Sequence, residues 1–157
     1  MLKIGLLILL CLVVLITVFM AFRLVGEATK SQSMHPELGV VNGALLDCPS
    51  SPNCVSSRAT DAKHGIEVIA DDDGVGWTAL ADRVSAMSGA KLVIKQDDYI
   101  WFEFSSSTLG FVDDVEFLNE PANQQISVRS ASRVGYSDFG ANRKRIEAIR
   151  LALKSGH

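Results

Sequence analysis

The sequence has few of the residues that mark metalloproteins and hydrolases. It contains three cysteines and three histidines in 157 residues, and their spacing fits no common zinc pattern, in which thiol ligands come as C-x₂₋₄-C. No G-x-S-x-G nucleophile elbow is present, and the DDDG stretch after Ala70 lacks the alternating ligands and terminal glutamate of a calcium loop. No pair of acidic residues is specific enough to indicate a glycosidase. We therefore expect no metal site and no cofactor.

Charge is absent from the N-terminal run Ile4–Phe22, which also has no proline and is flanked by Lys3 and Arg23. A helix needs about 20 apolar residues to cross the hydrocarbon core of a bilayer, so this run is long enough to span it. The alternative is a cleaved secretory signal, but the run is longer than the usual apolar region of a signal, and the MAFR sequence at its end is a poor cleavage site. We predict an uncleaved transmembrane anchor over residues 1–24.

Basic residues are also in deficit beyond the anchor. Without its first 24 residues the chain carries 13 basic and 18 acidic residues, a net charge of −5. This balance argues against a general affinity for nucleic acid or anionic lipid. Any site for an anion must be local, and we expect no nucleic-acid partner.

Cys48 and Cys54 enclose a short segment with two prolines and a turn-forming SSPN sequence. The spacing favours a small disulfide loop, and the alternatives are a reduced pair or a metal site that includes His35 or His64. A disulfide implies an oxidising compartment. The positive-inside count is ambiguous, because basic residues lie on both sides of the span. The cysteines therefore indicate a single-pass protein of the cell inner membrane with its domain on the periplasmic or outer side.

Hydrophobic periodicity predicts an α+β domain after the anchor. Residues 25–37 are polar and aperiodic, as in a short tether, and residues 38–58 indicate an irregular lead-in. We expect a helix over residues 77–87 with Asp72 or Asp73 as its N-cap, and a second helix over residues 141–154. The expected strands are residues 66–70, two strands within 91–104 around a turn at 96–98, and residues 111–118 and 126–133. The prediction is a single domain over 38–157, with an antiparallel sheet of about five strands and two helices on one face.

The last two strands favour one register. Only one register brings the apolar residues of both strands onto the same face of the sheet. In it, Val115 and Phe117 of the first strand lie beside Ile126 and Val128 of the second. That register sets Glu116 opposite Arg129 and leaves Asp114 on the same face as Arg129 and Arg133. Asp113 then lies on the apolar face, where an isolated carboxylate is costly unless it is hydrogen-bonded. The two acids and two arginines form either a cross-strand ion network or the lining of a cleft in which an arginine holds an anionic ligand.

The segment between the last strand and the last helix is rich in hydroxyl and basic side chains. Asp138 or Asn142 is the expected N-cap, and Arg143 and Arg145 in the first helical turn either pair with nearby acids or surround a bound anion. The candidate ligand-binding residues are Arg129, Ser130, Ser132, Arg133, Ser137, Asp138, Asn142 and Arg145. Their supporting acids are Asp113, Asp114 and Glu116.

The sequence contains three motifs in a fixed order: CPSSPNCVSS followed by Asp61 and His64, then FVDDVEF, then ISVRSASRVGYSDFGANRKRIEAIR. Together they resemble the family of domain of unknown function 1499. The resemblance covers about Gly39 to Arg150. It implies a single domain in an extracytoplasmic setting, often behind a membrane anchor, and it implies no established activity. Many of the matched positions are polar, which favours a shared site.

These observations lead to three hypotheses. The first is a membrane-tethered binding or accessory module with a local arginine and serine site for a small anion. The second is a hydrolase with His64 as the candidate base and a serine or a water as nucleophile. The third is a structural or assembly factor that presents a polar sheet face to a protein partner. The sequence leaves the enzymatic question and the oligomeric state open.

Overall fold

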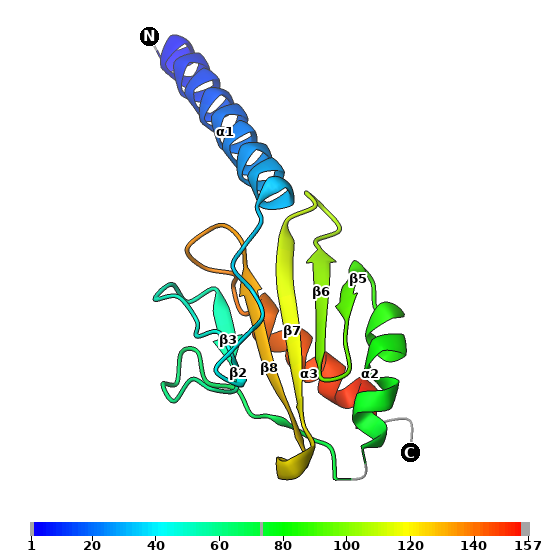
Figure 1. The fold of residues 1–157 in the computed structure, drawn as a ribbon. Coiled ribbons are helices and arrows are strands. Elements are labelled where there is room, and N and C mark those ends of the chain that lie inside the picture. Colours follow the sequence, from blue (N-terminus) through cyan, green and yellow to red (C-terminus); the bar gives the residue numbers. More distant parts are fainter. Residues whose placement is uncertain (1, 73, 155–157) are drawn as a thin grey trace.

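A long N-terminal helix projects from one end of an α+β domain (Figure 1). The computed structural model describes residues 2–72 and 74–154. Helix α1 spans Leu2–Ser33. By length and composition it is able to cross a membrane, and none of its most apolar stretch is buried against the domain.

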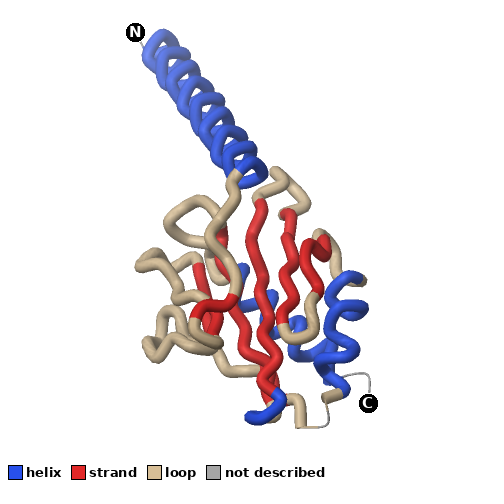
Figure 2. Tube along the Cα trace, in the orientation of Figure 1, coloured by secondary structure: helices blue, strands red, loops and turns tan. Residues whose placement is uncertain are grey.

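The domain is built on an antiparallel sheet (Figure 2). Its strands run in the order β3-β8-β7-β6-β5, and the short β4 also pairs with β8. Their bounds are Cys54–Ser56 (β3), Ile69–Ala70 (β4), Ala90–Lys95 (β5), Tyr99–Ser105 (β6), Val112–Glu120 (β7) and Gln125–Ser132 (β8). The turn Pro121–Asn123 (η1) joins β7 to β8. The α+β class and the four consecutive antiparallel strands predicted from the sequence are confirmed.

Two helices, α2 (Val75–Ser85) and α3 (Ala141–Lys154), pack on one face of the sheet. Every second residue of β6, β7 and β8 faces them, because side chains alternate along a strand. The buried core between the layers includes Phe102, Phe117 and Ile146. Burying one such side chain stabilises the fold by about 1.5–3 kcal/mol, so this layer contributes most of the domain's hydrophobic stability.

The start of α2 differs from the prediction. Asp72 does not cap the helix, and the side chain of Asp73 lies outside the described residues. The N-cap position is Gly74, which adopts a left-handed conformation with φ 71°. The carboxylate of Asp71 instead accepts hydrogen bonds from the backbone N–H groups of Gly76 and Trp77, at 2.8 and 3.0 Å. The glycine allows the chain to fold back so that an earlier aspartate reaches the first turn.

Residues 34–46 cover the opposite face of the sheet. They include the two-residue strands β1 (Val40–Val41) and β2 (Ala44–Leu45), which pair with each other. Leu45 is fully buried in a second apolar cluster with Tyr99 and Leu118. The expected irregular lead-in is therefore also a lid on this sheet face, which the sequence pattern did not reveal.

The segment expected to be a tether, residues 25–37, is helical as far as Ser33 because α1 continues through it. The last turns of α1 are also docked on the domain. Ala28 and Ser31 are buried there, Ser31 Oγ accepts from the backbone N–H of Val112 at 3.1 Å, and Gln32 donates to the carbonyl oxygen of Gly110 at 3.0 Å. The small side chains allow the helix to approach β7 closely.

Cys48 and Cys54 form the predicted disulfide, with an S–S distance of 2.04 Å. The bridge ties the lead-in to the edge strand β3, which contains Cys54. The third cysteine, Cys11, is free and exposed on α1.

Candidate functional site

Arg129 and Glu116 lie opposite each other on β8 and β7, in the register expected from the apolar pattern. The guanidinium of Arg129 donates to Glu116 at 2.7 Å, and the Glu116 side chain is fully buried. The same carboxylate accepts hydrogen bonds from the hydroxyl of Tyr99 at 2.8 Å and from the backbone N–H of Gly39 at 2.7 Å. A buried carboxylate requires partners of this kind, because burial without them is strongly unfavourable.

Arg133 binds two further acids on the same sheet face. Its Nε and Nη2 contact both oxygens of Asp114, at 2.8 and 2.7 Å, and Nη2 also contacts Glu103 at 2.7 Å. Nη1 donates to the carbonyl oxygen of Ser31 at 3.1 Å. This bidentate geometry is the strongest form of an arginine–carboxylate pair. The predicted register placed Asp114 on the same sheet face as Arg133, and it missed Glu103 and Ser31. We call Glu103, Asp114, Glu116, Arg129 and Arg133 the polar ladder.

Ionisation in the polar ladder follows from these contacts. The hydrogen bonds to Asp114 raise the pKa of Arg133, so the arginine stays charged. Burial and the neighbouring Glu116 carboxylate raise the pKa of Tyr99, so its hydroxyl remains a donor. Burial acts to raise the pKa of Glu103, but hydrogen bonds from Arg133 and Lys91 lower it on balance. Arg133 and Glu103 are therefore both charged at neutral pH, so that their ion pair is in place.

On the helix-covered face, Arg145 binds Asp113 at 2.6 Å. The same guanidinium donates to Ser130 Oγ and to Asn142 Oδ1, and it lies over the ring of Phe104, 4.9 Å from its centroid. Asp113 therefore has the partner that a carboxylate on the apolar side requires.

Asn142 is fully buried and joins three segments. Its amide nitrogen donates to the carbonyl oxygen of Asn53 and to Ser132 Oγ, both at 3.0 Å, and its oxygen accepts from Ser130 Oγ at 2.5 Å. The capping role belongs to Asp138, whose carboxylate accepts from the backbone N–H groups of Gly140 and Asn142. Asn142 is thus a cross-link between α3, β8 and the residue that precedes β3.

The sheet separates the predicted site residues into two groups. Arg129 and Arg133 lie on the face covered by residues 34–46, and the helix-covered face carries the second group. That group consists of Ser130, Ser132, Asn142 and Arg145. The structure does not bring all of them to one cleft. The anion-holding role of the arginines stays a prediction, and an anion would have to compete with the carboxylate that each arginine already binds.

Residues 133–140 form the segment that we call the corner loop. A cavity of about 350 Å³ lies between α1 and the corner loop. Leu24 and Glu27 line it from α1, and Phe111, Val134 and Phe139 line it from the domain. The lining is mostly apolar. Four of its polar members come from the predicted set, namely Asp113, Ser132, Ser137 and Asp138, and two do not, namely Glu27 and Ser106. We call this cavity the α1 pocket. The contribution from α1 was not predicted, since the helix was expected to end before a short tether.

His64 does not have the environment of a free general base. Its Nδ1 lies 3.0 Å from Asp61 Oδ2 and its Nε2 lies 3.1 Å from the carbonyl oxygen of Ser51. Both ring nitrogens are therefore used to hold the disulfide loop against the residues that precede His64. The hydrogen bond from His64 also lowers the pKa of Asp61.

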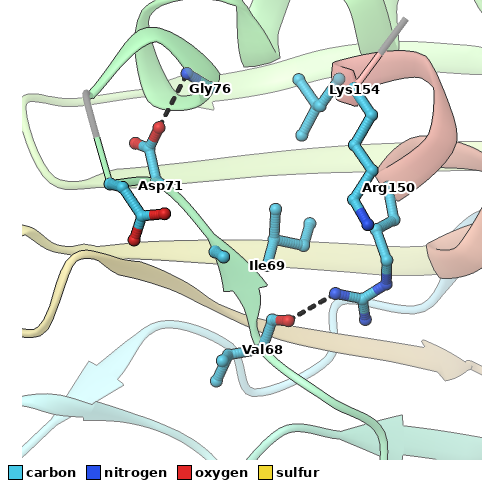
Figure 3. A pocket seen from close by; sticks show the side chains of 9 residues that line it. Val68, Ile69, Asp71, Gly76, Arg150 and Lys154 are labelled. Carbon is cyan, nitrogen blue, oxygen red and sulfur yellow. Dashed lines mark hydrogen bonds between the residues drawn. The ribbon is translucent and has the colours of Figure 1, made fainter.

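A second cavity, of about 220 Å³, lies where α2 begins and α3 ends (Figure 3). Asp71 faces it but binds the backbone N–H of Gly76, and Arg150 donates to the carbonyl oxygen of Val68 (Figure 3). Asp71 and Arg150 thus have structural partners. Across residues 2–72 and 74–154, no group of three or more histidine, cysteine, aspartate or glutamate side chains is placed to hold a metal ion.

Residues 44–153 match the family described as "Protein of unknown function (DUF1499)". The chain belongs to the DUF1499 family. The match covers the domain from β2 to the last turn of α3, and it includes the polar ladder, the Asn142 cross-link and the disulfide. Comparisons with curated proteins and with solved structures find no match. The family assignment therefore fixes the domain and leaves its activity to be argued from the site.

Proposed function

We propose that this DUF1499 chain is a single-pass membrane protein whose extracytoplasmic domain binds a small amphiphile in the α1 pocket. Two observations support the location. The apolar helix α1 has the length and composition of a membrane span, and the Cys48–Cys54 disulfide favours an oxidising compartment.

The observation that carries the proposal is the composition of the α1 pocket wall. The anchor helix contributes Leu24 and the domain contributes Phe111, Val134 and Phe139, so the cavity exists only where the two meet. Its volume of about 350 Å³ lies within the usual range of small-molecule sites, which are mostly apolar with a few polar groups. An apolar chain of the ligand fits this lining, and a polar head would contact the hydroxyl groups of Ser132 and Ser137.

The test uses the full chain in phosphatidylcholine nanodiscs with labelled methyl groups. Octanol, octyl phosphate and octylamine are titrated separately, so that one chain is compared with three head groups. We expect saturable shifts at the methyl groups of Val134 and Ala141, while Leu151, which lies outside the pocket lining on α3, does not change.

A pair of variants on α3 makes this test specific. Ala141 lines the pocket, whereas Ala148, two helical turns later and also exposed, does not. Ala141→Trp should fill the cavity and abolish the saturable shifts, and Ala148→Trp should leave them unchanged. Shifts that do not saturate, or that survive Ala141→Trp, contradict the proposal.

An arginine anion site is the second candidate, and one observation favours it. The Nε atom of Arg129 is buried and has no hydrogen-bond partner among the residues that the structure describes. Inorganic phosphate is added to the full chain, and the Nε–Hε signals of the labelled arginines are followed by NMR. Saturable movement of the Arg129 signal supports this candidate, and a signal that does not move argues against it.

A further inference from the structure

Two large aromatic residues in the corner loop are mostly exposed to solvent. Tyr136 is 76% exposed and Phe139 is 91% exposed. Phe139 also adopts a left-handed backbone conformation, with φ 53°, which is uncommon for a bulky residue without a specific reason. In the same loop the single acidic residue, Asp138, is occupied by backbone N–H groups at the start of α3. The tip of the loop therefore presents apolar surface.

The position of the loop relative to α1 indicates what covers this surface. The corner loop lies at the end of the domain from which α1 emerges (Figure 1). Leu24 of α1 lines the same pocket as Val134 and Phe139. Contacts of Ser31 and Gln32 with β7 and its preceding loop, together with the bond from Arg133, fix the base of the helix on the domain.

The depth of Leu24 follows from helix geometry. The uncharged run ends at Phe22, so Leu24 lies about 3 Å further along the helix axis at 1.5 Å per residue. The headgroup layer on each side of the hydrocarbon core is about 5–7 Å thick. Leu24 is then inside that layer, and the corner loop that shares its pocket is at or beside it.

We infer that the corner loop is a second membrane contact, in which Tyr136 and Phe139 lie in the headgroup layer of the leaflet next to the domain. This inference rests on the anchoring part of the proposed function and is independent of ligand binding. Tyrosine is favoured at this depth because its apolar ring and its hydroxyl are both satisfied there. Phenylalanine is among the apolar residues that interfacial segments bury at the boundary between headgroups and acyl chains. The contact depends on aromatic surface, in keeping with a domain whose acidic balance disfavours binding through charge.

A spin label measures the depth of the loop in the full chain, reconstituted into phosphatidylcholine vesicles. The label is placed at Phe139→Cys in a Cys11→Ala background, where the remaining cysteines are joined in the disulfide. The measured quantity is the ratio of the label's collision rate with oxygen to its collision rate with a water-soluble nickel complex. We expect this ratio to be several-fold higher at Phe139→Cys than at a matched control. The control is Leu151→Cys, at an apolar residue of α3 that is 66% exposed. Tyr136→Cys is a second reporter on the same loop.

Native Cys11 separates failure of this inference from failure of the anchor, because a label on Cys11 reports the span itself. Membrane-like accessibility at Cys11 with water-like accessibility at both loop positions overturns the inference and leaves the anchor intact. Water-like accessibility at Cys11 overturns the anchor and the inference together. Low collision rates of the loop labels with both oxygen and the nickel complex would show that a second copy of the chain covers the loop. This outcome would also overturn the inference.

Discussion

Arg133 donates a hydrogen bond to the carbonyl oxygen of Ser31, and this 3.1 Å contact joins the last turn of α1 to the sheet. The same guanidinium binds Asp114 and Glu103. A positive charge at the C-terminal end of a helix is favourable, because the carbonyl groups of the last turn are unpaired there. One side chain thus connects α1 to the ion network of the domain.

Removal of this side chain should destabilise the domain. In Arg133→Ala the carboxylate of Asp114, whose side chain is 2% exposed, loses both bonds from the guanidinium. Loss of one partner of a buried pair costs about 3–5 kcal/mol. Urea unfolding of the full chain in detergent micelles measures this change. Arg143→Ala is the matched control, since Arg143 makes one exposed contact with the carbonyl oxygen of Lys63, and a change within about 0.5 kcal/mol is expected. Equal effects of the two variants would contradict the role of Arg133.

The hydroxyl of Tyr99 should stabilise the fold through Glu116. Tyr99→Phe removes a 2.8 Å hydrogen bond to a buried carboxylate, and hydrogen bonds to charged groups contribute about 1.5–3 kcal/mol. Tyr136→Phe removes the same hydroxyl from an exposed residue and should have no measurable effect. The free energy of unfolding of both variants provides the comparison, and a neutral Tyr99→Phe would show that Glu116 does not need this donor.

Stability should fall in acid because carboxylates of the native state have lowered pKa values. The pKa of Glu103 is lowered from its usual 4.5, and the hydrogen bond from His64 lowers the pKa of Asp61. A depressed native pKa gives stability that is fully present above the unfolded pKa and is lost as the pH falls through the folded value. The free energy of unfolding should therefore be level above about pH 5 and decrease below about pH 4. Glu103→Gln should make this decrease shallower, and a stability that rises on acidification would contradict the assignment.

The Cys48–Cys54 disulfide should stabilise the domain modestly, since it closes a short ring. The loop-entropy relation gives about 2–2.5 kcal/mol for a ring of this size. Unfolding measured with and without reductant provides the value, and Cys48→Ser should match the reduced protein. Complete thiol labelling of the native chain before reduction, at all three cysteines, would show that the bridge does not form.

The central part of the fold, strands β7 and β8 and helix α3, could be predicted from the sequence. Strands β7 and β8 carry apolar residues at alternating positions, and a shift by one residue would expose that entire face. The pairing of Glu116 with Arg129 follows from this constraint and is confirmed. Helix α3 also has its predicted bounds, because its apolar spacing and its start after a glycine are local signals.

The parts that sequence reasoning missed depend on contacts between distant segments. Residues 34–46 show no periodicity, so their position over Tyr99 and Leu118 has no local signal. Glu103 lies 30 residues before its partner Arg133. The strand that contains Glu103 was predicted, but the sequence pattern does not show which side chains of other strands lie next to it. The α1 pocket needs the helix to continue into a segment that is polar enough to suggest a tether.

The most direct measurement of the central claim is photo-cross-linking of a lipid-like ligand to the full chain. An octyl amphiphile with a diazirine on its alkyl chain is irradiated with the protein in nanodiscs, and the modified peptides are identified by mass spectrometry. Binding in the α1 pocket predicts modification of the segment 132–141, its loss in Ala141→Trp, and its retention in Ala148→Trp. Labelling confined to α1, or labelling of 132–141 that is equal in the two variants, would contradict a ligand site between α1 and the domain.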